Sequence, residues 1–368
     1  MYDSTIRQFV TAAGWILSLL CCLSPAFAQT APVSGVLIKD DAVYIQFSDP
    51  KCSYMRPSSI NPSLAVTGSC TTEAGTLNGF VRDVFGRVTI FNIDGKPTEA
   101  VDINASGAVT GLYDDAKGVH GFLRSPVGTI TSFDVPFQSC GVLVRCTTFP
   151  SAINDGGTIT GSWQFGGGHP QGFVRSADGT FALFINTLKG LVPFDVNREG
   201  AITGSIFQPI TDIPQGFMRS PDGTITGFQI GFSATIPFGI NRDGVTAGIW
   251  RNPFGNPHGF LRSPDGSVTS FDYPGDVVVN GPIFVNRSSS GVLGGINAFG
   301  VVTGTYVDKE QHTQGYVRSS NGILTTFNLG PGDTTAVSIN DLGIVTGSYS
   351  PDSKTSRGFL RVPFRSPT

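Results

Sequence analysis

One motif recurs seven times along this chain, and it limits the folds open to the chain more than any other feature. Each copy reads Ile-Asn-x-x-Gly-x-Val-Thr-Gly, then Gly-Phe-Leu-Arg-Ser, a turn, and Thr-x-Phe, with some variation between copies. Repetition at a spacing of about 43–56 residues is typical of propellers and solenoids. The Asn of successive copies stands at Asn61, Asn104, Asn154, Asn197, Asn241, Asn297 and Asn340.

Each copy contains four short runs that favour β-strands. The runs are rich in Val, Ile, Thr and Phe, which strands prefer. Turn residues separate them, such as Asn-x-x-Gly at residues 154–157 and Ser-Pro-Asp-Gly at residues 263–266. The chain has 48 Gly but only four Glu, which argues against helices. Four antiparallel strands per copy predict one blade of an all-β propeller.

The two ends of the chain complete each other in this pattern. The last copy stops after the run that contains Gly358-Phe359, so its fourth strand is missing. The run Ala42–Phe47 near the start of the chain supplies a candidate for that strand. We therefore expect residues 29–368 to form a single domain, a seven-bladed β-propeller of four-stranded antiparallel blades. The N-terminal strand is expected to close it by pairing with the last blade, which would remove exposed sheet edges.

Residues 1–28 have the pattern of a signal peptide. Arg7 precedes a short apolar stretch, and Ala26-Phe27-Ala28 fits the small-x-small cleavage rule. A lipoprotein signal is the alternative, since Cys21 and Cys22 lie in this segment. No later stretch is long and apolar enough to predict a transmembrane segment. We expect a secreted or periplasmic protein.

Four cysteines follow the predicted signal peptide, and an even number in an exported protein favours disulfides. Three pairings are open, and proximity in the sequence favours Cys52–Cys70 and Cys140–Cys146. The spacing of Cys and His does not resemble a metal site, so we expect no metal and no cofactor. The net charge of −3 gives no basic surface that would indicate nucleic acid as a partner.

The copies resemble the repeat of the bacterial HAF-type extracellular repeat proteins. The likeness rests on residues 258–262, His-Gly-Phe-Leu-Arg, and on residues 296–304, Ile-Asn-Ala-Phe-Gly-Val-Val-Thr-Gly. Gly here replaces the central Ala of that family's His-Ala-Phe in every copy, and His remains only at His120 and His258. The resemblance implies an exported repeat protein and no particular reaction.

Two polar positions recur in every copy, and we interpret both as scaffold. The residue before each Gly-Phe can form hydrogen bonds, and we expect it to bond to neighbouring backbone, so that His120 and His258 are not catalytic. The recurrent Arg is expected to form a salt bridge or a cation–π stack on a neighbouring Phe, and not a ring that binds anions. The Arg positions are Arg82, Arg124, Arg175, Arg219, Arg262, Arg318 and Arg361.

Residues that depart from the repeat are the candidates for a binding site. Trp163 and Trp250 share one repeat position, either for packing between blades or as an aromatic platform for a sugar or peptide. Asp114 and Asp308 do not lie in the repeated turns. All four lie near the connections that vary in length, which in a propeller share one face. We expect a ligand site there.

The sequence carries no motif that identifies an enzyme, such as a nucleophile elbow, a Walker loop or His-Glu-x-x-His. We therefore expect a non-enzymatic binding or structural propeller at the cell envelope or outside the cell, with a glycan or envelope protein as partner. The alternative is a propeller-type polysaccharide hydrolase or lyase that uses carboxylates on the loop-rich face. A third interpretation is a surface protein that assembles with other envelope proteins. The sequence leaves the oligomeric state open.

Overall fold

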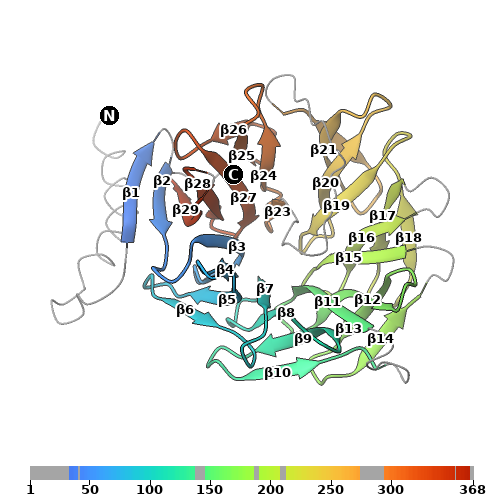
Figure 1. The fold of residues 1–368 in the computed structure, drawn as a ribbon. Helices are drawn as coiled ribbons and strands as arrows, with labels where there is room; N and C mark the ends of the chain where they lie inside the picture. Colours follow the sequence, from blue (N-terminus) through green and yellow to red (C-terminus); the bar gives the residue numbers. More distant parts are fainter. Residues whose placement is uncertain are drawn as a thin grey trace, which may run out of the picture.

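The fold is an all-β propeller, as the repeat predicts. A computed structural model of the chain describes residues 33–39, 42–136, 146–185, 190–207, 213–273, 294–352 and 354–364. These residues form β-strands that are arranged in sheets around a central axis (Figure 1). The predicted signal peptide and Cys140 lie outside the described residues.

Four of the sheets have four antiparallel strands each, in sequence order from the axis outward. The first contains β3 (Tyr54–Ile60), β4 (Val66–Thr71), β5 (Leu77–Arg82) and β6 (Val88–Phe91). The second contains β15 (Gly190–Val196), β16 (Ile202–Phe207), β17 (Pro214–Arg219) and β18 (Ile225–Phe228). The third contains β19 (Thr235–Ile240), β20 (Thr246–Arg251), β21 (Pro257–Arg262) and β22 (Val268–Phe271). The fourth contains β23 (Gly294–Ile296), β24 (Val302–Val307), β25 (Thr313–Arg318) and β26 (Leu324–Phe327).

A fifth sheet has eight strands and joins two copies of the repeat. One copy contributes β7 (Thr98–Ile103), β8 (Val109–Asp115), β9 (Gly118–Arg124) and β10 (Ile130–Phe133). The next contributes β11 (Cys146–Ile153), β12 (Ile159–Phe165), β13 (Gln171–Arg175) and β14 (Phe181–Phe184). The start of β11 pairs in parallel with β9, where Cys146 lies opposite Gly118.

The last sheet has five strands and contains both ends of the chain. It consists of β27 (Asp333–Ile339), β28 (Val345–Ser350), β29 (Arg357–Pro363), β2 (Ala42–Phe47) and β1 (Val33–Lys39). β2 pairs antiparallel with β29, so that Phe47 lies opposite Gly358. β1 adds a further antiparallel strand outside β2.

These sheets correct the predicted architecture. The prediction of seven separate four-stranded blades, closed by one N-terminal strand, is wrong. The described strands form six hydrogen-bonded sheets, and only four of these have four strands. Two copies merge because the first residues of β11, Cys146 and Thr147, pair with β12 on one side and with the start of β9 on the other. The closing sheet differs because the N-terminal segment folds back as a two-stranded hairpin, β1 and β2, instead of a single strand.

The repeated residues explain why the same elements form in each copy. The side chain of each repeated Asn accepts a hydrogen bond from the main-chain N–H four residues later, as Asn154 does from Thr158. This bond caps the turn between the first two strands, and Gly157 in that turn takes φ +79°, a conformation that glycine adopts without strain.

Phe rings and Arg side chains fill the space between neighbouring sheets. The Phe of the third strand is fully buried in six copies, at Phe80, Phe122, Phe173, Phe217, Phe260 and Phe359. Each recurrent Arg lies over a Phe ring of the preceding copy, at 4.8–5.2 Å from the ring centroid. Arg82 lies over Phe47 of β2, which links the first sheet to the last. The interpretation of these Arg side chains as scaffold is confirmed.

The repeated Asn side chains form a closed circle of hydrogen bonds around the axis. The Asn61 amide donates to the main-chain carbonyl of Asn104, and the bond recurs from each Asn to the next until Asn340 donates to the carbonyl of Asn61. All seven side chains are buried. We call Asn61, Asn104, Asn154, Asn197, Asn241, Asn297 and Asn340 the Asn belt. It lies where the innermost strands end.

Candidate functional site

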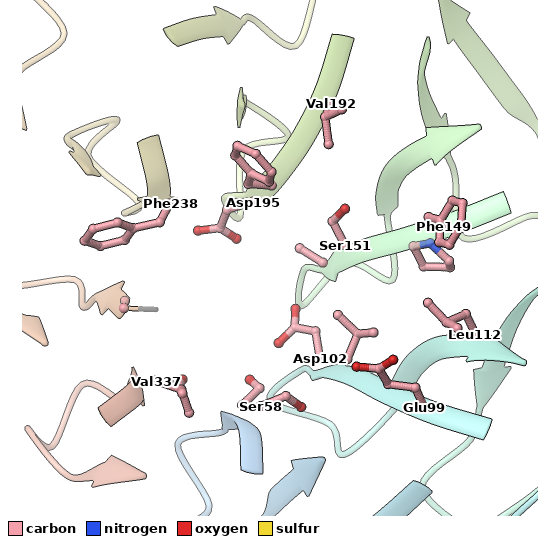
Figure 2. Close-up of a pocket in the computed structure, with 18 of the residues that line it drawn as sticks. Ser58, Glu99, Asp102, Leu112, Phe149, Ser151, Val192, Asp195, Phe238 and Val337 are labelled. Atoms are coloured by element: carbon pink, nitrogen blue, oxygen red, sulfur yellow. The ribbon is translucent and has the colours of Figure 1, made fainter. Parts of the chain in front are cut away.

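A cavity of about 240 Å³ lies on the axis of the propeller. Every innermost strand contributes to its lining, namely β3, β7, β11, β15, β19, β23 and β27. Figure 2 shows carboxyl, hydroxyl and apolar side chains around this space. Because each strand belongs to a different copy of the repeat, only the closed ring brings these side chains together.

Two carboxyl groups in the cavity each connect adjacent copies. Asp102 lies two residues before Asn104, and Asp195 lies two residues before Asn197. Asp102 accepts hydrogen bonds from the N–H of Ile103 at 2.9 Å and, in the next copy, of Ile153 at 2.8 Å. Asp195 accepts the equivalent bonds from Val196 and Ile240, both at 2.8 Å. The surface that each carboxyl group keeps exposed faces the cavity (Figure 2).

The surroundings favour the neutral form of both carboxyl groups. Burial, helped by the charge of Asp102 and opposed by the hydrogen bonds from Ile240 and Val196, raises the pKa of Asp195 to about 7. Burial likewise raises the pKa of Asp102, although Ser59, Ile153 and Ile103 donate hydrogen bonds to it. Both side chains are half-buried, and the surface that they expose is part of the cavity lining.

The remaining lining is largely apolar, with one further carboxyl group. Glu99 is 4% exposed and lies near the start of β7, away from the Asn belt. The apolar and aromatic side chains include Phe149, Val192, Phe194, Phe238 and Val337. Among the described residues, no Lys, Arg or His lines the cavity. The site therefore combines acidic groups with an apolar wall.

The four side chains predicted to bind a ligand do not line this cavity. Trp163 is 8% exposed and packs in a cluster with Phe133 and Phe173. Trp250 stacks on His258 at 4.7 Å between ring centroids and donates from Nε1 to Ser270.

The two predicted aspartates also lie in separate copies. Asp114 is half-buried near the end of β8, and Asp308 accepts hydrogen bonds from Glu310, His312 and Gln314 in the turn after β24. Nothing in these contacts tests binding, so a ligand role for all four side chains stays a prediction. Asp308, Glu310 and His312 also bring three potential metal-ligand atoms within 4.8 Å of one another, on a largely exposed turn.

The two histidines before Gly-Phe bond mainly to side chains. The prediction of a bond to neighbouring backbone is wrong for both, because the residue after the outer Phe supplies a carboxylate at hydrogen-bonding distance. His120 bonds to Asp134 and Asp115, and His258 bonds to Asp272. Burial lowers the pKa of His120, but the bonds to Asp134 and Asp115 outweigh it, so the pKa is raised overall.

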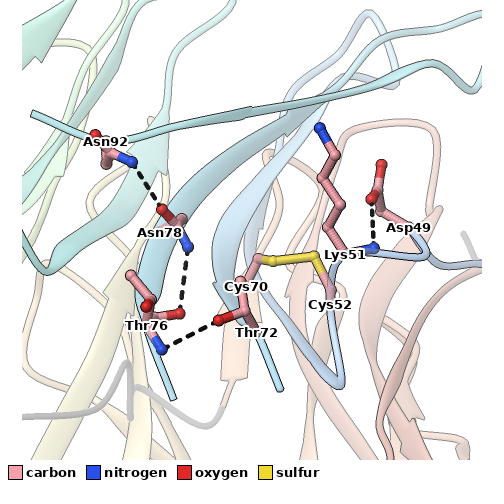
Figure 3. The surroundings of a disulfide bond; sticks show 8 residues. All are labelled: Asp49, Lys51, Cys52, Cys70, Thr72, Thr76, Asn78 and Asn92. Carbon is pink, nitrogen blue, oxygen red and sulfur yellow. Dashed lines mark hydrogen bonds between the residues drawn. A yellow bond between two sulfur atoms is a disulfide. The ribbon is translucent and has the colours of Figure 1, made fainter. Parts of the chain in front are cut away.

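A disulfide joins Cys52 to Cys70, as proximity in the sequence predicts (Figure 3). It ties the segment between β2 and β3 to β4. Cys146, the first residue of β11, is also disulfide-bonded. Because Cys140 lies outside the described residues, the Cys140–Cys146 pairing stays a prediction.

The sequence did contain one signal for the acidic cavity. The position two residues before each belt Asn is small or acidic in every copy: Ser59, Asp102, Ala152, Asp195, Gly239, Gly295 and Ser338. Two Asp at a position otherwise held by Ser, Ala or Gly depart from the repeat. They lie on the innermost strands, whereas the predicted site residues lie near the connections between strands.

Comparisons with known proteins show the fold and no family. No protein-family model and no curated protein matches the sequence, so the resemblance to HAF-type repeat proteins stays a prediction. A streptogramin B lyase structure matches with a TM-score of 0.57 and 15% identity, over 87% of this chain and 97% of that one. Virginiamycin B lyase from Staphylococcus aureus matches with a TM-score of 0.54 and 16% identity, over 87% and 98%.

A puromycin hydrolase is also similar, with a TM-score of 0.61 and 13% identity. The match covers 84% of this chain and 53% of the hydrolase, so this chain spans about half of that protein's length. At such identities the likeness supports a β-propeller and carries no residue or reaction across. No helix in the described ranges has the length and apolar character needed to cross a membrane.

Proposed function

We propose that this chain is an exported, non-enzymatic binding propeller that acts at the cell envelope or outside the cell and holds a small ligand in its axial cavity. The observation that carries the proposal is the cavity itself, with polar groups of several copies converging in an apolar enclosure. Ligand sites are typically concave and mostly apolar, with a few placed polar groups. The Cys52–Cys70 disulfide is compatible with an oxidising compartment, and the signal-peptide pattern supports export.

The contacts of the two aspartates favour binding over catalysis. A pair of carboxyl groups that cleaves glycosidic bonds needs one protonated acid and one carboxylate held in its charged form. Here burial raises the pKa of Asp102 as well as that of Asp195. Both oxygens of each carboxyl group already accept main-chain hydrogen bonds. A polysaccharide hydrolase or lyase is therefore the less favoured function, although the named structural neighbours include a lyase and a hydrolase.

Blocking the cavity tests this proposal. Ser151 lines the cavity and has a small side chain, so Ser151→Phe would fill part of the space. Residues 29–368 would be screened by thermal shift and calorimetry against neutral, anionic and cationic small molecules and against oligosaccharides. Ligands should be recovered unchanged by mass spectrometry, and Ser151→Phe should weaken binding at least about tenfold.

The matched control is Ser320→Phe, which adds the same ring at an exposed turn. It should leave binding unchanged. Binding that survives Ser151→Phe would place the site elsewhere, with the predicted side chains Asp114, Trp163, Trp250 and Asp308 as the next to test. Conversion of a bound compound into product would overturn the non-enzymatic assignment.

A further inference from the structure

Among its described residues, the axial cavity is lined by acidic side chains and by no basic ones. Asp102 and Asp195 present carboxyl groups to it, and their contacts within hydrogen-bonding distance are N–H groups and the Ser59 hydroxyl, all neutral. Glu99 adds a third carboxyl group at the end away from the Asn belt. Since carboxylates away from bulk water are stabilised by a cation, an occupant with a positive charge would gain the most from this site.

The apolar wall restricts the kind of cation. Phe194 and Asp195 are consecutive on β15, and Phe238 contributes a second ring from β19, the strand that also bonds to Asp195. Figure 2 shows the Phe238 ring and the Asp195 carboxyl group on neighbouring sides of the cavity. Aromatic rings attract ammonium groups and also cover apolar surface. Such a wall suits a cation that carries a hydrocarbon body.

The spacing of the acids argues against a bare metal ion. Within the described ranges, three metal-ligand atoms gather within 4.8 Å only at Asp308, Glu310 and His312, and not in the cavity. Hard divalent ions require six or more oxygen ligands in a tight shell. The three cavity acids are too far apart to supply half of such a shell. An extended ligand can instead meet separate acids with its ammonium hydrogens and hydrogen-bonding groups.

We propose that the axial cavity binds an organic ammonium ion, a small primary amine whose charge lies against Asp102 and Asp195 and whose apolar body packs on Phe194 and Phe238. This inference rests on the proposed binding function of the cavity and specifies its ligand class. A volume of about 240 Å³ holds a body of the size of a butyl or benzyl group.

The test compares probes that differ in charge and share a shape. Butylammonium and benzylammonium would be titrated into residues 29–368 by calorimetry, beside butanol, benzyl alcohol, benzoate and calcium chloride. At least one ammonium ion should bind about tenfold more tightly than its alcohol. Asp195→Asn and Asp102→Asn should each remove most of that difference. Asp243→Asn, at an exposed turn on the Asn-belt side, should leave it unchanged.

A second measurement needs no variant. Butylammonium affinity of the unmodified protein should fall as the pH is lowered from 8 to 5, because Asp195 gains a proton near pH 7 while the amine keeps its charge. Benzyl alcohol affinity should not change over this range. A flat pH profile for the ammonium ions would contradict the inference, even if the Asn variants failed to fold.

The outcomes separate this inference from the function on which it rests. If only alcohols or benzoate bind, and Ser151→Phe abolishes their binding, the cavity is a binding site but the ammonium assignment is wrong. If calcium alone binds and Asp102→Asn removes it, the occupant is a metal ion and the inference is also wrong. If none of these probes and none of the wider screen binds, both the function and the ligand class are overturned.

Discussion

At the scale of single residues, a ring contact explains the glycine before each buried Phe. A Cβ atom added at Gly216 would lie 2.5 Å from the Phe228 ring, and the equivalent Gly of the other copies face the same obstacle. The Phe of the outer strand rests on the backbone of its neighbour at this point. This contact accounts for the Gly at this position in every copy, because the methyl group of an Ala would occupy the position of the ring.

Replacing that glycine tests the contact directly. Gly216→Ala should lower the free energy of unfolding by about 1–3 kcal/mol, since the added methyl group must displace Phe228. Gly227→Ala on the adjacent strand is the control, because its nearest contact would be 3.9 Å away. Urea denaturation of both variants measures the difference. Equal stability of the two variants would show that the Phe228 ring can move aside without loss of stability.

The Asp195 carboxyl group should give the protein a measurable dependence on pH. Its pKa rises from 3.8 to about 7 on folding, so between these values the folded protein keeps a proton that the unfolded chain has lost. This contribution to stability is complete below about pH 4 and is lost as the pH rises through 7. Asp195→Asn should therefore flatten the decline in stability between pH 4.5 and 7.5, measured by urea denaturation. An unchanged slope would contradict the raised pKa.

At the scale of elements, the two N-terminal strands have different roles. β2 fills the outer position of the last sheet, where Phe47 covers Gly358 and receives Arg82 from the first sheet. β1 lies outside β2, and its Val36 and Ile38 are 54% and 70% exposed. The Cys52–Cys70 disulfide follows β2 directly and holds the entry to the first sheet. β2 is thus part of the closed structure, whereas β1 is an addition to its edge.

Two truncations separate these roles. A chain that begins at Asp41 lacks β1 and should melt close to a chain of residues 29–368, because it loses mainly exposed side chains and the bond from Lys39 to Asn328. A chain that begins at Lys51 also lacks β2 and should lose more than the about 3–5 kcal/mol of a buried Phe→Ala change. Calorimetric melting compares them. Similar melting of both chains would show that β2 does not secure the ring.

At the scale of the whole molecule, the Asn belt connects every copy of the repeat to the next one around the axis. Each belt side chain both caps its own turn and donates to the next copy. In Asn197, Oδ1 accepts from the N–H of Ala201 and Nδ2 donates to the carbonyl of Asn241. The last bond, from Asn340 to Asn61, joins residues 279 positions apart. Every copy is therefore hydrogen-bonded to both of its neighbours, and the seven bonds form a closed circle.

Removal of one belt side chain should weaken the whole ring. Asn197→Ala leaves the carbonyl of Asn241 with only the bond from the Gly244 N–H and removes the cap on the Ala201 N–H, so the expected loss is about 2–4 kcal/mol from two hydrogen bonds. Asn252→Ala is the control, since Asn252 caps an exposed turn through Phe254 and Asn256 and donates to no other copy among the described residues. Equal losses of stability in both variants would show that the belt side chains stabilise only their own turns.

The strands and turns of this protein could be predicted from local patterns in its sequence. Strands and turns follow from local chemistry, because Val, Ile and Thr favour extended backbone and Asn-x-x-Gly caps its own turn within five residues. The Arg–Phe stacks and the Cys52–Cys70 disulfide were also predictable, since a repeated residue indicates a repeated contact and near neighbours in the sequence can reach each other.

How the copies join and what they enclose depends on tertiary packing. The parallel pairing of β11 with β9 joins residues of two different copies, and no local pattern specifies such a contact. Asp102 and Asp195 belong to different copies with a third between them, and they face one cavity only because the ring closes. A candidate site built from single residues of separate copies has no spacing in the sequence by which it could be found, because the distances across the axis are set by the packing of whole sheets.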